Sequence, residues 1–412
     1  MIKKACILAS VIYLSLAILS PGLVQAQSEL AVLGSSAEVE FPSSLSFNLS
    51  AESDVNITDI RLRYIVDRAS FAQVTSEVYI KFVPTTLVDV NWTLEMVRIG
   101  GLPPGSSLDY WWVVEDAKGD RVETVPVRVQ FDDTRYSWHS LTEGEVTIYW
   151  YKGDESFAQQ LMAAAQGALN RLARDTGASL DKPAKLYIYA NAQDLKGAMI
   201  YPQDWTGGVA FTRYGIIAIG IAPDRLNWGR RAIAHELAHL VIHQMTLNPY
   251  SGLPTWLDEG LAMYAEGMLE PAFTTYLNKA VAEDSLISVR SLSSPFSAYA
   301  EESYLSYAQS YSLVEFLISN YGQARMLELL LTFKQGSSYD GALEKVYGFD
   351  MGGLNTLWRD YVTRQHQPKV VAETVTVAVY KPALIGILSA LATALLLAIG
   401  LAIESWVWRR GW

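Results

Sequence analysis

A run of twenty-one residues without a charge, 383–403, constrains this chain of 412 residues more than any other feature. About 20 apolar residues are enough for a helix to cross a bilayer. Two tryptophans and two arginines follow the run, a pattern typical of a membrane boundary and a cytoplasmic tail. We expect a transmembrane helix at 382–404 and a cytoplasmic tail at 405–412, with a buried core helix as the alternative.

A second apolar block, at 5–19, opens the chain behind two lysines and ends near a small-residue cleavage pattern at 24–26. This arrangement predicts a signal peptide at 1–26, with an uncleaved anchor as the alternative. Together the two blocks predict a single-pass protein of the cell membrane whose folded part is extracytoplasmic. The only cysteine, Cys6, lies within the signal, so no disulfide is expected.

The charge pattern argues against nucleic acid as a partner. The net charge is −11 and the pI is about 5.0. The sequence has no basic patch with interleaved aromatic residues, which a nucleic-acid interface needs. The acidic balance therefore indicates a solvated surface.

Short alternating segments separated by turn signals fill residues 28–133. They predict strands at 44–51, 60–66, 78–83, 91–97, 110–115 and 121–131. Strands at this spacing indicate a β-sandwich of immunoglobulin or fibronectin type, without the disulfide of immunoglobulin domains. Residues 102–124 resemble the late strands of fibronectin-like modules.

Residues 134–366 mix strands and helices, which makes the whole chain α+β. We expect strands at 145–151 and 185–190, a hairpin at 207–221, and helices at 157–176 and 229–245. From residue 259 onward the pattern is helical, with segments at 260–267, 272–282, 304–321 and 324–336 and a last helix around Trp358. A polar, strand-like stalk at 367–381 leads to the membrane segment.

Three of the five histidines lie within ten residues of one predicted helix. His235 and His239 are four residues apart, which places them about 40° apart around the helix and one turn along it. Two imidazoles on one face can bind the same Zn²⁺ ion. Glu236 lies beside that face, where it can deprotonate a water molecule at the metal. His243, eight residues after His235, is rotated by about 80° around the helix and is expected to be a packing or supporting residue.

A catalytic zinc site needs a third protein ligand and an open position. Nineteen residues separate His239 from Glu259, enough to leave the first helix, form a loop and begin a second helix. Glu259 is the expected third ligand, and its neighbour Asp258 is the alternative.

The two motifs, HELAH and WLDEG, resemble the gluzincin metallopeptidases of the peptidase MA-like group, related to aminopeptidase N and leukotriene A4 hydrolase. The resemblance extends over about residues 140–360 and is strongest in HELAHLVIHQ, LPTWLDEGLAMYAEG and SYAQSYSLVEFLISNYG. It implies a zincin-type catalytic domain with a helical C-terminal subdomain. It also implies the ligands His235, His239 and Glu259, with Glu236 as the general base.

The same resemblance implies two further roles. Glu266, seven residues beyond Glu259 and therefore on the same helix face, would orient a ligand histidine, although it could also be a plain surface glutamate. Tyr307 would stabilise the oxyanion, with Tyr304 and Tyr311 as alternatives. Ser310 stands where the family's tyrosine motif has glycine.

The exopeptidase motif of the aminopeptidases is absent, which puts aminopeptidase specificity in doubt. The corresponding segment contains Gly207, Gly208, Val209 and Ala210 and no glutamate. An edge strand there could bind an extended peptide by main-chain pairing.

The sequence as a whole predicts a membrane-anchored zinc peptidase that hydrolyses peptide or protein substrates. The alternatives are a surface adhesion or sensor protein whose zincin fold is inactive, and a zinc hydrolase of small non-peptide substrates.

Overall fold

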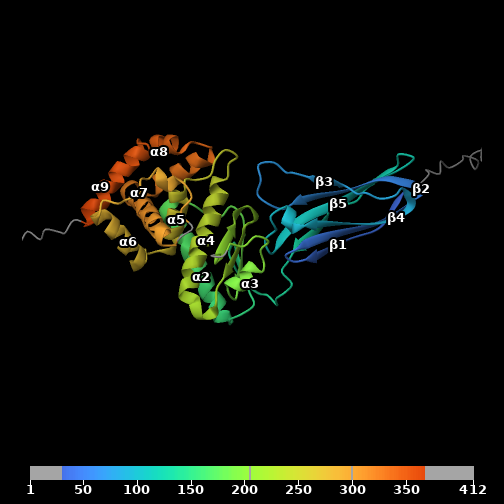
Figure 1. Ribbon diagram of the computed structural model, residues 1–412, viewed down its shortest axis with the longest axis horizontal. Helices are drawn as coiled ribbons and strands as arrows, with labels where there is room; N and C mark the ends of the chain where they lie inside the picture. The colour runs from blue at the N-terminus through green and yellow to red at the C-terminus, as the bar shows by residue number, and fades with distance from the viewer. Residues whose placement is uncertain (1–29, 204–205, 298–299, 367–412) are drawn as a thin grey trace, which may run out of the picture. The chain divides into compact units, whose positions relative to one another are not determined.

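The structure, a computed structural model, describes residues 30–203, 206–297 and 300–366. Strands dominate up to residue 131, a second sheet with its helices follows, and the chain from residue 226 onward is mainly helical (Figure 1). The protein is therefore a mixed α+β chain with an N-terminal β-rich region and a helical C-terminal part, as predicted.

The predicted signal peptide, stalk, transmembrane helix and cytoplasmic tail lie outside the described residues. None of the helices within the described ranges combines the length and the hydropathy that a bilayer-spanning segment needs.

The β-rich region contains β1 (Ala31–Glu40), β2 (Ser44–Val66), β3 (Ser76–Tyr79), β4 (Thr85–Glu95), β5 (Ser106–Asp116), β6 (Arg121–Glu123) and β7 (Val127–Phe131). The first half of β2 pairs with β1 and β4, and its second half pairs with β3 and β5. The partners change where the register shifts, between Glu52 and Ile57. One long strand therefore takes part in two sets of pairings.

The two halves of β2 face each other across a common interior. Phe47 and Tyr64, one from each half, stack with their ring centroids 6.4 Å apart. Alternate side chains, among them Leu45, Phe47 and Leu62, are fully buried, as the period of two in a strand requires. The immunoglobulin or fibronectin type of this region stays a prediction.

The second sheet contains β8 (His139–Glu143), β9 (Val146–Trp150), β10 (Ala184–Tyr189), β11 (Gly208–Phe211) and β12 (Ile216–Gly220). Its order is β11-β12-β10-β9-β8, with the three central strands parallel and the two outer strands antiparallel. Helices α2 (Glu155–Thr176) and α4 (Leu226–Thr246) pack on one face. Tyrosines of β10 on the other face, with α3 (Ala192–Lys196), share a core with the β-rich region.

The helical part contains α5 (Thr255–Glu266), α6 (Pro271–Ala282), α7 (Ala300–Lys334), α8 (Tyr339–Tyr347) and α9 (Met351–His366). Its core is one cluster of apolar side chains drawn mainly from α4, α5, α7, α8 and α9. The predicted helices at 304–321 and 324–336 are parts of α7, which is interrupted at Gly322, where φ is +79°.

Helix α4 is enclosed by both halves of this fold. Ile233, Leu237 and Leu240 pack against the sheet. Ala238, Val241 and Ile242 belong to the helical core. The remaining face of α4 carries His235, Glu236 and His239, so packing on both sides fixes the direction in which these side chains point.

Some predicted strands differ from the observed ones. The segment 121–131 is two strands, because Pro126 has no N–H to donate to a sheet ladder. The strand expected at 91–97 ends at Glu95, and Met96–Arg98 forms a short 3₁₀ helix instead.

Candidate metal centre

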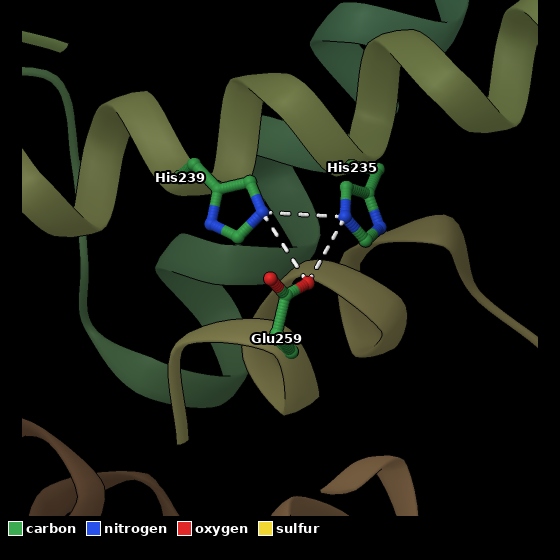
Figure 2. Close-up of side chains that lie close together, drawn as sticks. All are labelled: His235, His239 and Glu259. Carbon is green, nitrogen blue, oxygen red and sulfur yellow. Dashed lines mark hydrogen bonds and ion pairs between the residues drawn. The ribbon is translucent and has the colours of Figure 1, made fainter. Parts of the chain in front are cut away.

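Helix α4 supplies two imidazoles and helix α5 supplies one carboxylate to the same point (Figure 2). The Nε2 atoms of His235 and His239 are 3.2 Å apart. Glu259 Oε2 lies 3.4 Å from the first and 3.6 Å from the second. The structure thus brings together the three side chains that the sequence proposes as ligands.

A carboxylate behind each ring determines which nitrogen carries the proton. His235 Nδ1 lies 2.9 Å from Glu266 Oε1, and His239 Nδ1 lies 2.9 Å from Asp258 Oδ1. An ionised carboxylate only accepts hydrogen bonds, so each Nδ1 must donate. In the neutral rings each Nε2 then has a free electron pair, and the two pairs point toward the same region as Glu259 Oε2.

Three electron pairs at these separations fit a divalent metal ion. A tetrahedral ion with ligands at about 2.0–2.1 Å holds neighbouring ligand atoms about 3.3–3.4 Å apart. Separations of 3.2, 3.4 and 3.6 Å agree with that geometry. Glu259 Oε2 is buried without a hydrogen-bond partner among the described residues, a costly state that a bound cation would relieve.

Asp258, the alternative ligand in the sequence, faces away from this point. Its second oxygen, Oδ2, lies 2.8 Å from His243 Nε2. His239, His243 and Asp258 are close enough to form a second donor group. However, Asp258 bonds to both rings at hydrogen-bond lengths, whereas the atoms of the first group leave room for an ion. Asp258 therefore supports His239, and His243 in turn supports Asp258.

The ionisation of the metal-free site reflects its surplus of carboxylates. Burial lowers the pKa of His235, but the carboxylates of Glu259 and Glu266 outweigh burial and raise this pKa to about 9. The pKa of His239 is likewise raised, against burial, by Asp258 and Glu259. Burial raises the pKa of Glu259, but both imidazoles outweigh it and lower this pKa to about 2. The cluster attracts positive charge, whether protons or a metal ion.

Strand β11 lies beside the proposed general base. An added Cβ at Gly208 would stand 3.0 Å from Glu236 Oε1, so the strand begins against that carboxylate. A Cβ at Gly207 would lie 3.6 Å from the Trp228 ring of α4. Val209 and Ala210 continue the strand as partly exposed residues. The segment predicted to bind substrate is therefore next to the donor cluster.

Of the three candidate tyrosines, Tyr307 of α7 is the one whose phenol is influenced by the charges of Glu259 and Glu236. Burial raises its pKa, and the negative charges of Glu259 and Glu236 raise it further, so the phenol stays protonated. Tyr311 instead donates to Glu315, and Tyr304 packs against Phe273.

Close contact between α5 and α7 brings Tyr307 near the donor cluster. A side chain at Gly260 would collide with the carbonyl of Ser310, so glycine permits this approach. Ser310, which stands where the tyrosine motif of the gluzincins has glycine, therefore lies directly against Gly260 of α5.

Arg231 is a charged neighbour of the site that the sequence did not single out. Its guanidinium lies 2.6 Å from Glu270 and 3.9 Å from Glu266 Oε2. Arg231 precedes His235 by four residues, so helical spacing alone places it on the same face. It helps to hold the carboxylate that orients His235.

The comparison with known protein families agrees with this geometry. Residues 164–364 match the Peptidase MA superfamily. The match includes α4, α5 and α7, and thus the donor cluster, Glu236 and Tyr307. It supports a metallopeptidase and does not identify the ion.

Individual proteins and solved structures show only weak similarity to this chain. No curated protein matches the chain. Among solved structures, aminopeptidase A of Legionella pneumophila in complex with aspartic acid has 11% identity and a TM-score of 0.33, over 81% of this chain and 49% of that one. Catalytically inactive OgpA of Akkermansia muciniphila, in complex with an O-glycopeptide, has 8% identity and a TM-score of 0.20, over 27% of this chain and 32% of that one. The chain thus spans a third to a half of the length of these proteins, and both similarities are too low to support an argument.

Proposed function

We propose that this protein is a zinc-dependent peptidase of the gluzincin type, which hydrolyses peptide bonds with a water molecule activated by the metal and by Glu236. One observation carries the proposal. Two imidazoles with their Nδ1 atoms occupied converge, at separations of 3.2–3.6 Å, with a buried carboxylate oxygen that has no hydrogen bond within the described part of the chain. Two imidazoles, a carboxylate and an open position are a donor set of catalytic zinc sites.

Zn²⁺, when bound, supplies a Lewis acid that polarises the scissile carbonyl and lowers the pKa of water. Glu236 takes the proton from the attacking water and passes it to the leaving amine. The protonated hydroxyl of Tyr307 donates a hydrogen bond to the carbonyl oxygen as it becomes negative. Asp258 and Glu266 keep the two imidazoles in the tautomer that has its electron pair on Nε2.

The substrate of this proposal is a peptide in extended conformation. Strand β11 ends the sheet order, with β12 on one side and no strand on the other within the described ranges. An extended peptide can pair with such an edge through its main chain. This pairing would carry the scissile bond past Gly208 and the carboxylate of Glu236.

The proposal also includes the cellular location. The apolar segments at 1–26 and 382–404 favour a single-pass protein of the cell membrane with its catalytic part outside the cytoplasm. The β-rich region is then a sandwich module of the same extracytoplasmic part.

Metal analysis and a peptide cleavage screen of the full chain test the function. We expect about one zinc per chain and cleavage of members of a mixed peptide library. Glu236→Gln should keep the metal and lower turnover by about 10²–10⁴-fold, since it removes the general base. Glu145→Gln makes the same chemical change at an exposed position in the turn before β9 and should leave turnover unchanged.

Three results would contradict the proposal. A chain that binds no metal is no metallopeptidase. Bound zinc without cleavage of any peptide would favour an inactive adhesion or sensor protein. Unchanged turnover in Glu236→Gln would show that another group is the base.

A further inference from the structure

A hollow of about 360 Å³ lies at the end of β11, beyond the metal centre. Thr212 and Arg213, which follow β11, line one side of it. The end of α4, from His243 to Leu247, and the loop at 248–253 line another side. Ala69 and Phe71, from the segment between β2 and β3, complete the lining.

The hollow is within reach of a peptide bound at the metal centre. His243 lies one helical turn beyond His239, about 6 Å along α4. Phe211 lies three residues beyond Gly208, which is about 10 Å along an extended strand. A peptide that follows the free edge of β11 from Glu236 would therefore bring a side chain to the hollow two to four residues from the scissile bond.

Within the described part of the chain, Arg213 is the one arginine or lysine that lines the hollow. The fourteen lining residues include no aspartate or glutamate. Arg213 has no ion pair among the residues that the structure describes, and its side chain is exposed. Asp67, which shares a neighbouring hollow with Arg213, lies 3.5 Å from Arg128 instead. The imidazole of His243 is held by Asp258 at 2.8 Å.

The main chain that carries Arg213 is fixed on both sides. The carbonyl of Arg213 accepts a hydrogen bond from the amide of Ala69 at 2.6 Å. Gly215, with φ +69°, ends the short 3₁₀ helix Thr212–Tyr214 and turns the chain into β12. The main chain of Arg213 is therefore held in place beside the hollow, and its exposed guanidinium is free to bind a carboxylate through two parallel hydrogen bonds.

We propose that this hollow binds an acidic side chain of the substrate, two to four residues from the bond that is cut. The inference rests on the proposed peptidase function and narrows its substrate class to peptides cut within the chain near an acidic residue. A free amino terminus finds no carboxylate in the hollow to pair with, so the hollow favours the interior of a chain over its amino end. The segment at 69–71 gives the β-rich region a part in substrate selection.

The affinities of two peptides that differ in a single side-chain functional group test the inference. Two peptides, blocked at both ends and identical except for one glutamate or glutamine, are compared for binding to the zinc-loaded Glu236→Gln chain by fluorescence anisotropy. We expect the glutamate peptide to bind about three- to tenfold more tightly at low salt, with the difference falling as salt is added. The advantage should be confined to a glutamate two to four residues from the cleavage site.

Variants of Arg213 connect the preference to the hollow. Arg213→Lys should keep most of the preference, Arg213→Gln should abolish it, and Arg213→Glu should favour a lysine peptide. Arg225→Gln, an exposed arginine ten residues before His235, is the matched control and should change nothing. Circular dichroism checks that each variant folds.

Equal binding of the glutamate and glutamine peptides would overturn the inference, as would a preference that survives Arg213→Gln. These outcomes are distinct from failure of the peptidase function. If the unmodified chain cuts no peptide, the function fails, while the binding comparison still decides whether the hollow selects acidic side chains.

Discussion

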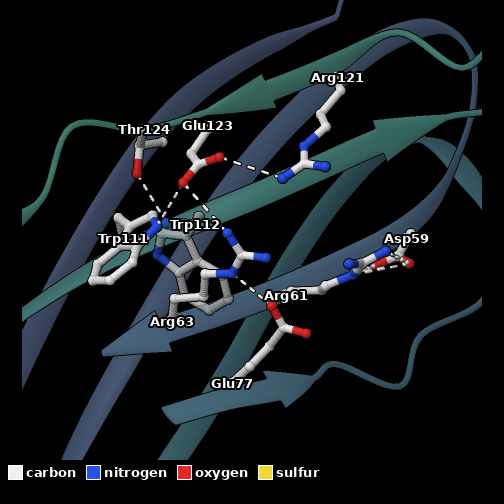
Figure 3. A network of polar contacts seen from close by, with 9 residues as sticks. All are labelled: Asp59, Arg61, Arg63, Glu77, Trp111, Trp112, Arg121, Glu123 and Thr124. Carbon is white, nitrogen blue, oxygen red and sulfur yellow. Dashed lines mark hydrogen bonds and ion pairs between the residues drawn. The ribbon is translucent and has the colours of Figure 1, made fainter. Parts of the chain in front are cut away.

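Two charged networks of this protein differ in how their charges are balanced. On the β-rich region, Arg61, Arg63 and Arg121 face Asp59, Glu77 and Glu123 (Figure 3). At the metal centre, four carboxylates surround His235 and His239, and Arg231 is the one arginine or lysine with an ion pair to any of them among the described residues.

In the network on the β-rich region, the charges of the acidic and basic side chains balance one another. Arg63 lies 2.5 Å from Glu77 and 3.5 Å from Glu123, and the indole of Trp111 donates to Glu123 at 2.9 Å. The hydrogen bond from Arg63 lowers the pKa of Glu77. Each acid has a basic neighbour, so this surface requires nothing further.

At the metal centre, the charges of the carboxylates are not balanced by neighbouring basic side chains. Its ligand side chains are 14–21% exposed, and Oε2 of Glu259 has no hydrogen bond from any residue that the structure describes. Charges in such a place cost free energy unless a counter-charge joins them. An unbalanced, partly buried cluster of charges, rather than charge density alone, thus indicates a site for a bound cation.

The largest expected effect is that of Glu259→Gln. The substitution removes the anionic ligand, so zinc affinity should fall by more than about a hundredfold and turnover should be lost. Glu77→Gln is the matched change in the balanced network and should leave both quantities unchanged. Isothermal titration of zinc into each chain measures the difference. Equal zinc affinities in the two variants would contradict the ligand assignment.

A smaller effect is expected from the carboxylates behind the rings. Asp258→Asn and Glu266→Gln should each weaken zinc binding by about 10–100-fold. Each substitution removes the negative charge that holds one imidazole, so that imidazole becomes a less basic and less well oriented ligand. Competition with a fluorescent chelator measures this loss. If both variants bind zinc as tightly as the unmodified chain, the hydrogen bonds to Nδ1 do not support the metal.

The pH dependence of zinc binding is a further test of the unbalanced charge at the metal centre. A pKa of about 9 for His235 means that below pH 9 the metal-free ring holds a proton that zinc must displace. Zinc affinity should therefore rise with pH over the range below about 9, by up to tenfold per unit for each proton displaced. Titrations in buffers of different ionisation enthalpy also count the released protons. An affinity that is constant over this range would contradict the protonated resting state.

The smallest expected effect is that of Arg63→Gln. Ion pairs at a protein surface contribute little to stability, so the unfolding temperature should fall by no more than about one or two degrees. Zinc affinity should not change. Differential scanning calorimetry at low and high salt measures the shift, which should shrink as salt is added. A large loss of stability would show that this network does more than balance its own charges.

The donor cluster could be predicted from the sequence because helical geometry determines it. Two histidines four residues apart share a face in any α-helix, and Glu266 lies two turns after Glu259. The family resemblance implied that Glu266 orients a ligand histidine, and the structure shows that this histidine is His235. The roles of the three groups stay predictions until they are tested in solution.

The direction in which the Asp258 side chain points could not be predicted in the same way. Whether a residue next to a ligand faces the metal or the back of an imidazole depends on how α5 crosses α4. The hollow beside Arg213 depends on a segment more than a hundred residues away, at 69–71. Such relations arise from tertiary packing and leave no periodic pattern.

The fold was predictable to a similar degree. The alternating pattern predicts most strands of the β-rich region. It does not show that 44–66 is one strand with two sets of partners, because the mainly polar residues 53–56 interrupt the pattern. The strand at 31–40 went unnoticed because glycine and serine weaken its alternation. The predicted end of the helix at residue 176 was correct, since Gly177 follows it in a left-handed conformation that glycine adopts at little cost.

The middle of helix α4 packs against the sheet on one side and the helical core on the other, and it carries the donor side chains on its remaining face. Few amino-acid substitutions can therefore be tolerated there. Exchanges that repack the sheet side would rotate the imidazoles, and exchanges on the other side would shift Glu259. Relatives with new substrate preferences should therefore differ in the loop at 248–253 and the segment at 69–71, while the helix stays nearly constant. A designer who wishes to alter selectivity should begin at those two surface segments.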